Sequence, residues 1–233
     1  MKTAVISDIH GNLEALQAAL ERIDALQIDR TVCLGDIVGY GASPNECVEL
    51  LRERKILSVV GNHDKAVTGE LSIETFSIVA KLGVEWTRSV ITKENEDFLR
   101  GLPYAVEIDD ALFVHSSPDL PQFFRYLFTQ DDAEGSFDAF NNRICFIGHT
   151  HRPVVFCEDS VSTQLISGKR FIVNVGSIGQ PRDGDRRGCF VIYDDEEFYI
   201  EHVRVEYDIQ SAATKIINAG LPQKLADRLK IGI

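Results

Sequence analysis

Gly148-His149-Thr150-His151 follows the apolar run Ile144-Cys145-Phe146-Ile147, which is typical of a short, buried β-strand. The glycine predicts a turn where the strand ends, and the two histidines are separated by a single residue. In an extended segment, side chains at positions i and i+2 point to the same side. Two imidazoles on one side, directly after a strand, are a pattern typical of metal ligands.

Similar polar clusters follow other apolar runs upstream. They are Asp8-Ile9-His10, Gly35-Asp36 and Gly61-Asn62-His63-Asp64, and a single histidine, His115, follows a further run. The chain has 6 histidines, and all but His202 lie at these points. One such motif is weak evidence for a functional site. Because polar clusters recur after several strand-like runs, we interpret them as parts of one functional site.

Composition and charge narrow the class of protein. At 233 residues the chain is long enough for one large α/β domain, and no apolar run approaches the ~20 residues that span a bilayer. The N-terminus has a strand pattern and not that of a signal peptide. The 5 cysteines lack CxxC spacing, which favours a reducing cytoplasm. The formal charge of -12 argues against a nucleic-acid surface, since phosphate backbones are bound through lysine and arginine.

The first third of the chain alternates between strand and helix patterns. We expect strands at 2–6, 31–34 and 56–60, and helices at 13–26 and 44–54. This β-α-β-α-β order predicts a parallel sheet with right-handed crossovers. Ligands of such sheets bind beyond the carboxyl ends of the strands, which is where the first three polar clusters lie.

The rest of the chain does not continue this regular alternation of strands and helices. Helices are expected over 70–102, with a division near Thr92, and two short helices within 116–142; the helical segments 65–103 and 116–142 would lie near the site. Strands are expected at 104–108, 111–115, 153–157, 162–166, 170–175, 189–194 and 197–205, the last five as a second, largely antiparallel layer. The tail 208–230 is expected to be helical with a break at Gly220-Leu221-Pro222. No linker divides the sequence, so we expect one domain over 1–233.

The candidate metal ligands are Asp8, His10, Asp36, Asn62, His115, His149 and His151. Seven ligands are too many for one tetrahedral zinc ion, but they suit two cations that share one group. Asp36 is the best bridge, because the two oxygens of a carboxylate can face both cations. Paired cations clamp the attacking and leaving oxygens of a displacement, and they lower the pKa of bound water to ~7, which provides a hydroxide nucleophile.

In this order, the blocks Asp8-x-His10, Gly35-Asp36, Gly61-Asn62-His63-Asp64, His115 and Gly148-His149-x-His151 resemble the signature of the calcineurin-like metallophosphoesterases. The resemblance implies an α/β (α+β) fold of four layers, in which two mixed β-sheets pack as a sandwich flanked by helices. It implies that Asp8, His10 and His151 hold one metal, that Asn62, His115 and His149 hold the other, and that Asp36 bridges them. It also implies that His63 assists the leaving group as a catalytic residue and that Asp64 orients His63.

Three stretches are similar to the compact bacterial and archaeal phosphodiesterase branch: Gly35-Asp36-Ile37-Val38-Gly39-Tyr40-Gly41, Asn174-Val175-Gly176-Ser177-Ile178-Gly179-Gln180-Pro181-Arg182-Asp183, and Ala219-Gly220-Leu221-Pro222. Protein phosphatases usually carry an arginine after Gly-Asp and a glutamate after Gly-Asn-His, and neither is present here. We therefore expect a two-metal phosphodiesterase that uses a metal-bridging hydroxide as nucleophile. A phosphomonoesterase or protein phosphatase and a nucleotide pyrophosphatase remain alternatives on the same site. The complete ligand set disfavours a non-catalytic scaffold.

Two nitrogen- and oxygen-rich sites without thiolates suit two divalent ions, which could be Mn, Fe, Co, Ni or Zn, with Mn favoured. The expected partner is a small phosphorylated substrate, and neither nucleic acid nor a membrane is expected; a homodimer is left open. Arg182 could bind a phosphate oxygen or pair with Asp183 at the surface. Asn12 could approach the substrate or only cap a helix. The aromatic residues Phe76 and Tyr126 are interpreted as packing residues.

Overall fold

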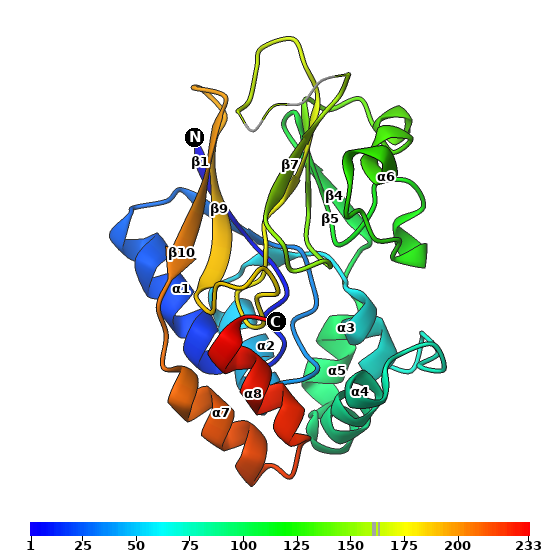
Figure 1. Cartoon of the computed structure of the whole chain (residues 1–233), viewed down its shortest axis with the longest axis vertical. Helices are drawn as coiled ribbons and strands as arrows, with labels where there is room; N and C mark the ends of the chain where they lie inside the picture. Colours follow the sequence, from blue (N-terminus) through cyan, green and yellow to red (C-terminus); the bar gives the residue numbers. More distant parts are fainter. Residues whose placement is uncertain (160–161, 163) are drawn as a thin grey trace.

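The structure is a computed structural model that describes residues 1–159, 162 and 164–233. One of the two five-stranded sheets in this part has the order β10-β9-β1-β2-β3, with β10 at Tyr199–Val205, β9 at Gly188–Asp194, β1 at Lys2–Ile6, β2 at Arg30–Cys33 and β3 at Leu57–Ser58 (Figure 1). β1, β2 and β3 pair in parallel, as the alternating pattern predicted. β9 pairs antiparallel with both β1 and β10.

The other sheet has the order β4-β5-β6-β8-β7, with β4 at Ala105–Ile108, β5 at Ala111–Val114, β6 at Ile144–Ile147, β8 at Phe171–Asn174 and β7 at Val154–Cys157. Its inner pairs, β5-β6 and β6-β8, are parallel, and its outer pairs are antiparallel. Both sheets are therefore mixed, as the family resemblance implied.

The expectation of a separate, largely antiparallel layer after His151 is wrong. β9 pairs with the free edge of β1 and β10 pairs with β9, which completes the first sheet. β8 lies parallel to β6 in the second sheet. A strand pattern reveals the strand but not its partner, because pairing is decided by contacts distant in sequence. The strand predicted at 162–166 falls partly on residue 163, outside the described residues, and 162 and 164–166 are not in a strand.

The two sheets face each other across a buried apolar core. On β1, Val5 points into this core, whereas its neighbours Ala4 and Ile6 point to the helices on the outer face. Phe146 on β6 lies at the centre of the core, with its ring centroid 5.3 Å from those of Phe113 and Tyr193. Successive residues of β1 thus face alternately the core between the two sheets and the helices on the outer face.

Helices cover the outer faces of both sheets. Against the first sheet lie α1 at Leu13–Ala25 and α2 at Pro44–Glu53, and near the second sheet lie η1 at Pro121–Phe123, α6 at Gln130–Glu134 and η2 at Phe137–Ala139 (Figure 1). α1 begins where predicted, because the Asn12 side chain accepts a hydrogen bond from the amide of Ala15. These layers complete the predicted four-layer arrangement.

The remaining helices gather at one end of the sandwich: α3 at Asn62–Val67, α4 at Ile78–Val90, α5 at Lys93–Arg100, α7 at Ile209–Asn218 and α8 at Gln223–Ile231 (Figure 1). The helix expected from residue 70 begins only at Ile78, because Ser77 caps it by accepting from Ala80. The short α3 was not predicted. Among the described residues, no helix is both long and apolar enough to cross a membrane.

We expect Phe146→Ala to lower the free energy of unfolding by ~3–5 kcal/mol, because the substitution opens a cavity between the two sheets. Denaturant unfolding followed by circular dichroism measures the change. Phe123→Ala is the matched control; Phe123 is 72% exposed, so its loss should change stability by only ~0.5 kcal/mol or less. Similar effects of the two substitutions would show that the core does not lie between the sheets.

Candidate active site

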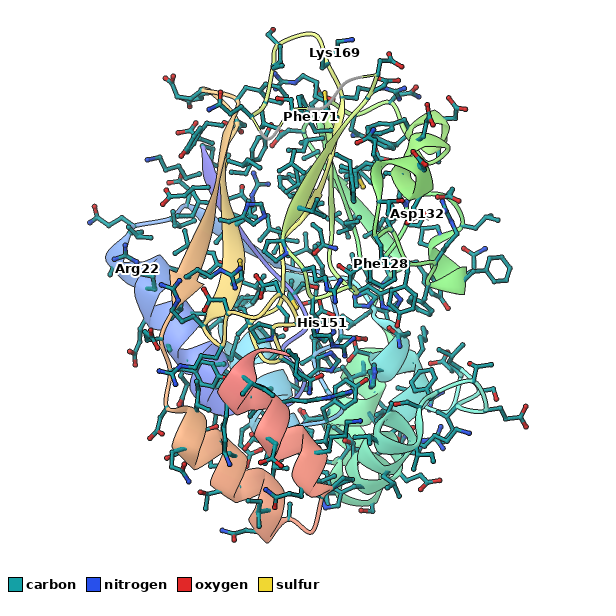
Figure 2. The ribbon with its side chains drawn as sticks, viewed as in Figure 1. Arg22, Phe128, Asp132, His151, Lys169 and Phe171 are labelled. Atoms are coloured by element: carbon teal, nitrogen blue, oxygen red, sulfur yellow. The ribbon has the colours of Figure 1, made fainter. Side chains whose placement is uncertain are left out.

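The polar clusters converge at one edge of the sandwich, where β1, β2, β3, β5 and β6 end. His151 lies where the ends of the strands meet the helices (Figure 2). All seven predicted ligands are buried: Asp8, His10, Asp36, Asn62, His115, His149 and His151. Five of them have a positive φ between 49° and 64°, namely Asp8, His10, Asp36, His149 and His151. Such conformations cost ~1–3 kcal/mol each and persist where the surroundings fix them, typically at functional sites.

One group of possible metal ligands consists of Asp8, His10, Asp36 and His151. The Nε2 atoms of His10 and His151 are 3.1 Å apart. The Oδ1 atom of Asp8 lies 3.2 Å from His151 Nε2, and the Oδ2 atom of Asp36 lies 3.6 Å from His10 Nε2. Four donor atoms thus surround one point.

A neighbouring group consists of Asp36, His115 and His149, to which Asn62 adds its amide oxygen. His115 Nε2 lies 3.1 Å from His149 Nδ1, 3.2 Å from Asn62 Oδ1 and 3.5 Å from Asp36 Oδ2. The same Asp36 oxygen therefore faces both groups. His149 and His151 join different groups, because both have left-handed backbone and not the extended conformation we had assumed from their spacing.

Backbone carbonyls fix which ring nitrogen carries the proton. The Nδ1 atoms of His10, His115 and His151 lie 3.1, 2.8 and 2.6 Å from the carbonyl oxygens of Val38, Leu34 and Gln180. A neutral imidazole has one N–H, so donation to these carbonyls leaves a lone pair on each Nε2. The lone pairs of His10 and His151 face each other, which is repulsive unless a cation lies between them. Carbonyl-anchored histidines of this kind are common metal ligands.

Burial lowers the pKa of the five clustered histidines, which are His10, His63, His115, His149 and His151. They are therefore in the neutral form that binds metals. Burial also raises the pKa of Asp36 well above its usual range, and the neighbouring carboxylates of Asp64 and Asp8 raise it further. Bound cations would relieve this penalty by stabilising the ionised form. The donor set and its electrostatics fit a pair of divalent cations.

Asp64 does not orient His63 as predicted, because its carboxylate binds backbone amides instead. Its Oδ1 atom accepts from the amides of Ile37 and Val38 at 2.9 and 3.2 Å, and its Oδ2 atom accepts from the amide of Gly61 at 2.9 Å. These bonds tie the loop after β2 to the loop after β3. Asp64 thus holds the backbone on either side of the site, including the segment that carries Asp36.

The ligands lie beside a cavity of about 560 Å³. Its wall includes two of the candidate ligands, the neighbouring His63, two arginines, and several aromatic and hydroxyl side chains. The wall residues include Tyr40, Asn62, His63, Ser72, Thr75, Phe76, Phe124, Tyr126, His149, Arg182 and Arg228. The His63 ring lies 4.5 Å from the ring of Tyr40 and 5.2 Å from that of Phe76. Its Nδ1 atom has no hydrogen-bond partner among the described residues. This atom is buried beside Gly39, and His63 can contact a bound ligand through the part of its ring that lines the cavity.

Of the two candidate substrate-binding residues, only Arg182 is available to a ligand, whereas Asn12 is used in the fold. Arg182 lines the cavity, and its Nη2 atom donates to Gln180 Oε1 at 3.1 Å and lies 3.5 Å from the Tyr40 hydroxyl. Asp183 is paired with Arg204 instead, which leaves Arg182 available to a ligand. Asn12 caps α1 and donates to the carbonyl of Gly179 at 2.9 Å, so both ends of its amide are already used.

The sequence model of the calcineurin-like phosphoesterase superfamily domain matches residues 1–197. The chain belongs to this superfamily. An uncharacterized protein from Methanocaldococcus jannaschii is 45% identical over 240 residues, which cover 98% of this chain and 97% of that protein. The match confirms the resemblance that the spaced ligand blocks had suggested.

Two solved structures share the fold. A metallophosphoesterase from Sphaerobacter thermophilus is 39% identical, with a TM-score of 0.89, over 100% of this chain and 99% of its own. A hypothetical protein from Pyrococcus horikoshii is 22% identical, with a TM-score of 0.85, over 100% and 98% of the two chains, and this likeness concerns the fold alone. Membership in the superfamily makes the protein a hydrolase of phosphate esters, with a cluster that could hold metal ions.

Tyr126 is a part of this phosphoesterase site that sequence reasoning missed. Its ring stacks on that of His149, with centroids 3.9 Å apart and planes 19° apart, and Phe128 stacks on Tyr126 in turn at 5.2 Å. Among the described residues, His149 Nε2 has no hydrogen-bond partner, unlike the carbonyl-bound nitrogens of the other ligand histidines. Stacking therefore takes the place of a hydrogen bond in orienting His149. A tyrosine in a loop carries no sequence signal for this role.

We expect Tyr126→Ala to weaken Mn²⁺ binding by ~2–10-fold, since an aromatic pair contributes ~0.5–1.5 kcal/mol to holding the His149 ring. Tyr126→Phe is the matched control and should bind Mn²⁺ as the native protein does, because the stacked ring remains. Competition with a chromophoric chelator measures both dissociation constants. Equal affinity in the alanine variant would show that the ring does not orient His149.

Proposed function

We propose that this phosphoesterase is a two-metal phosphodiesterase that acts on a small phosphorylated substrate. The observation that supports it most directly is the pair of ligand groups that share the Oδ2 atom of Asp36. Asp8, His10 and His151 would hold one ion together with Asp36, and Asn62, His115 and His149 would hold the other. Nitrogen and oxygen ligands without thiolates suit Mn, Fe, Co, Ni or Zn, and among these we favour Mn²⁺.

Two divalent ions bound there would supply Lewis acidity and a hydroxide nucleophile near neutral pH. The chain sets the charge of the site, since only Asp8 and Asp36 among the seven ligands are anionic. The neutral histidines therefore preserve a net positive charge that attracts a phosphate ester. Carbonyl partners such as Val38 and Gln180 hold the imidazoles in the required tautomer, so no reorganisation is needed when a ligand arrives.

His63 would assist the leaving group. Its buried ring lines the cavity, and Gly39 leaves the space that the ring occupies, because a Cβ atom at Gly39 would come within 2.5 Å of His63 Nδ1. Burial lowers the pKa of His63 in the protein alone. The negative charge of a bound phosphate ester would raise this pKa, so that the imidazolium can donate a proton to the departing alkoxide. Arg182, on the same wall, can donate to an oxygen of a phosphate group of the substrate with its guanidinium.

The preference for a diester rests on the resemblance to the compact phosphodiesterase branch and on the wall of the cavity. A diester carries an organic group on each side of phosphorus, and Phe76, Phe124 and Tyr126 give one such group an apolar surface. A small monoester would not fill about 560 Å³. A phosphomonoesterase and a nucleotide pyrophosphatase use the same ligands, so substrate comparison must separate them.

The test is hydrolysis of bis-p-nitrophenyl phosphate and p-nitrophenyl phosphate by chelator-stripped protein, with and without added Mn²⁺. We expect Mn²⁺ to restore hydrolysis, with a higher kcat/KM for the diester. Asp36→Asn should remove this metal-dependent activity, because both ligand groups lose their shared carboxylate. A higher kcat/KM for the monoester would replace our proposal with a phosphatase, and full activity of Asp36→Asn would refute the two-metal site.

We expect His63→Gln to lower kcat for the diester by ~10²–10⁴-fold, which is the usual contribution of a general acid. Its metal content should equal that of the native protein, because His63 lies outside both ligand groups. Metal analysis and steady-state kinetics on the same preparation check the two statements. A loss of metal in the variant would place His63 among the ligands and contradict its assignment as the acid.

A further inference from the structure

Arg228 brings a second guanidinium to the cavity. It lies on α8, in the tail beyond the residues 1–197 that the superfamily model matches. Together with Arg182 it lines the same cavity as His63 and the ligand His149. α8 is placed there by an apolar cluster that packs Leu225 and Leu229 with Tyr40. The C-terminal tail thus contributes a cationic side chain to the site.

Neither cavity arginine has a carboxylate partner among the described residues. Arg182 contacts only Gln180 and Tyr40 through its side chain, and its buried Nε atom has no partner in the described part of the chain. For Arg228, the same part of the structure contains no side-chain hydrogen bond or ion pair. Many other arginines of this acidic chain, with its net charge of -12, are paired with carboxylates, as Arg125 and Arg170 are, and some, such as Arg88, bond to a backbone carbonyl. The cavity therefore holds uncompensated positive charge.

This arrangement is unfavourable without an anion. Burial, and then the charge of Arg182, lower the pKa of Arg228, which means that its cationic form is destabilised in place. Two neighbouring guanidiniums with part of their hydration removed gain most from a doubly coordinated oxyanion. The metal ligands already account for the binding of one phosphoryl group, so the arginines have capacity for another.

We propose that the substrate carries a second phosphate group, in addition to the phosphoryl group that is cleaved, and that Arg228 binds it together with Arg182. The aromatic wall formed by Phe76, Phe124 and Tyr126 then contacts the organic part between or beside the two groups. The substrate class is a small organic phosphodiester with at least one further phosphate group. This inference rests on the proposed phosphoester hydrolysis, because the second group is defined relative to the one at the metal ligands.

The test compares binding of alkanediphosphonates with one, three or six methylene groups to binding of alkyl monophosphonates of equal length. Isothermal titration calorimetry is performed on Mn²⁺-loaded protein at a fixed free Mn²⁺ concentration, since diphosphonates bind Mn²⁺. We expect at least one diphosphonate to bind ~10-fold or more tightly than its monophosphonate, which is the usual size of a charge-assisted hydrogen bond. Arg228→Gln should lower this ratio at least threefold.

Lys224→Gln is the matched control, because Lys224 is an exposed cation on the same helix and lies outside the lining of the cavity. It should keep the native ratio. The inference is overturned if the native protein binds no diphosphonate at least ~10-fold more tightly than the monophosphonate of equal length. It is also overturned if Arg228→Gln lowers this affinity ratio less than threefold, or if Lys224→Gln lowers it as much as Arg228→Gln does. Hydrolysis of bis-p-nitrophenyl phosphate by the native protein tests the proposed function separately. If the native protein does not hydrolyse this diester but keeps the affinity ratio of diphosphonate to monophosphonate, the proposed function is rejected. If it hydrolyses the diester but lacks this affinity ratio, the second phosphate site is rejected.

Discussion

The carboxylate of Asp36 is the constraint on which the site depends. It is 1% exposed, and its Oδ2 atom lies within 3.6 Å of imidazole nitrogens from two loops that are otherwise separate. Its other oxygen accepts the amide of His63 at 2.8 Å, which fixes its direction. A buried carboxylate in left-handed backbone is costly by both burial and conformation. Cations bound at the two ligand groups would offset the cost of burying this carboxylate, which would couple the fold to the chemistry at this one residue.

The backbone around Asp36 is arranged so that side chains can approach it closely. A Cβ atom at Gly61 would clash with the Asp36 carboxylate, so only glycine permits the loop after β3 to pass there. Asp64 then joins the two loops through three amide hydrogen bonds. Because the sheets are held by an independent apolar core between them, the strained loops at their edge can be tolerated. The rigid sandwich holds these strained loops in place, and the loops position the candidate ligands.

The sequence predicted that the seven candidate ligands cluster and that the first sheet is parallel in part, because both depend on local patterns. Strand partners after His151 could not be predicted, since β9 pairs with β1 across more than half of the chain. The function of Asp64 was misjudged for a related reason: a side chain's partner is decided by loop geometry, and spacing does not reveal it. Arg228 carried no signal at all, because a cation on an amphipathic helix is normally a solvated surface residue.

Specificity must reside outside the ligand set. Metal ions held by the candidate ligands would contact only phosphoryl oxygens, which all phosphate esters share, so the ligands give no basis for choosing among substrates. The rest of the cavity is built from segments with no common pattern: residues 71–80, the loop at 123–126, Arg182 and α8. These segments place positive charge and aromatic surface together inside a protein of net charge -12. A localised field of this kind would attract compact anions while the acidic exterior would repel extended ones, which is consistent with the small phosphorylated substrate that we propose.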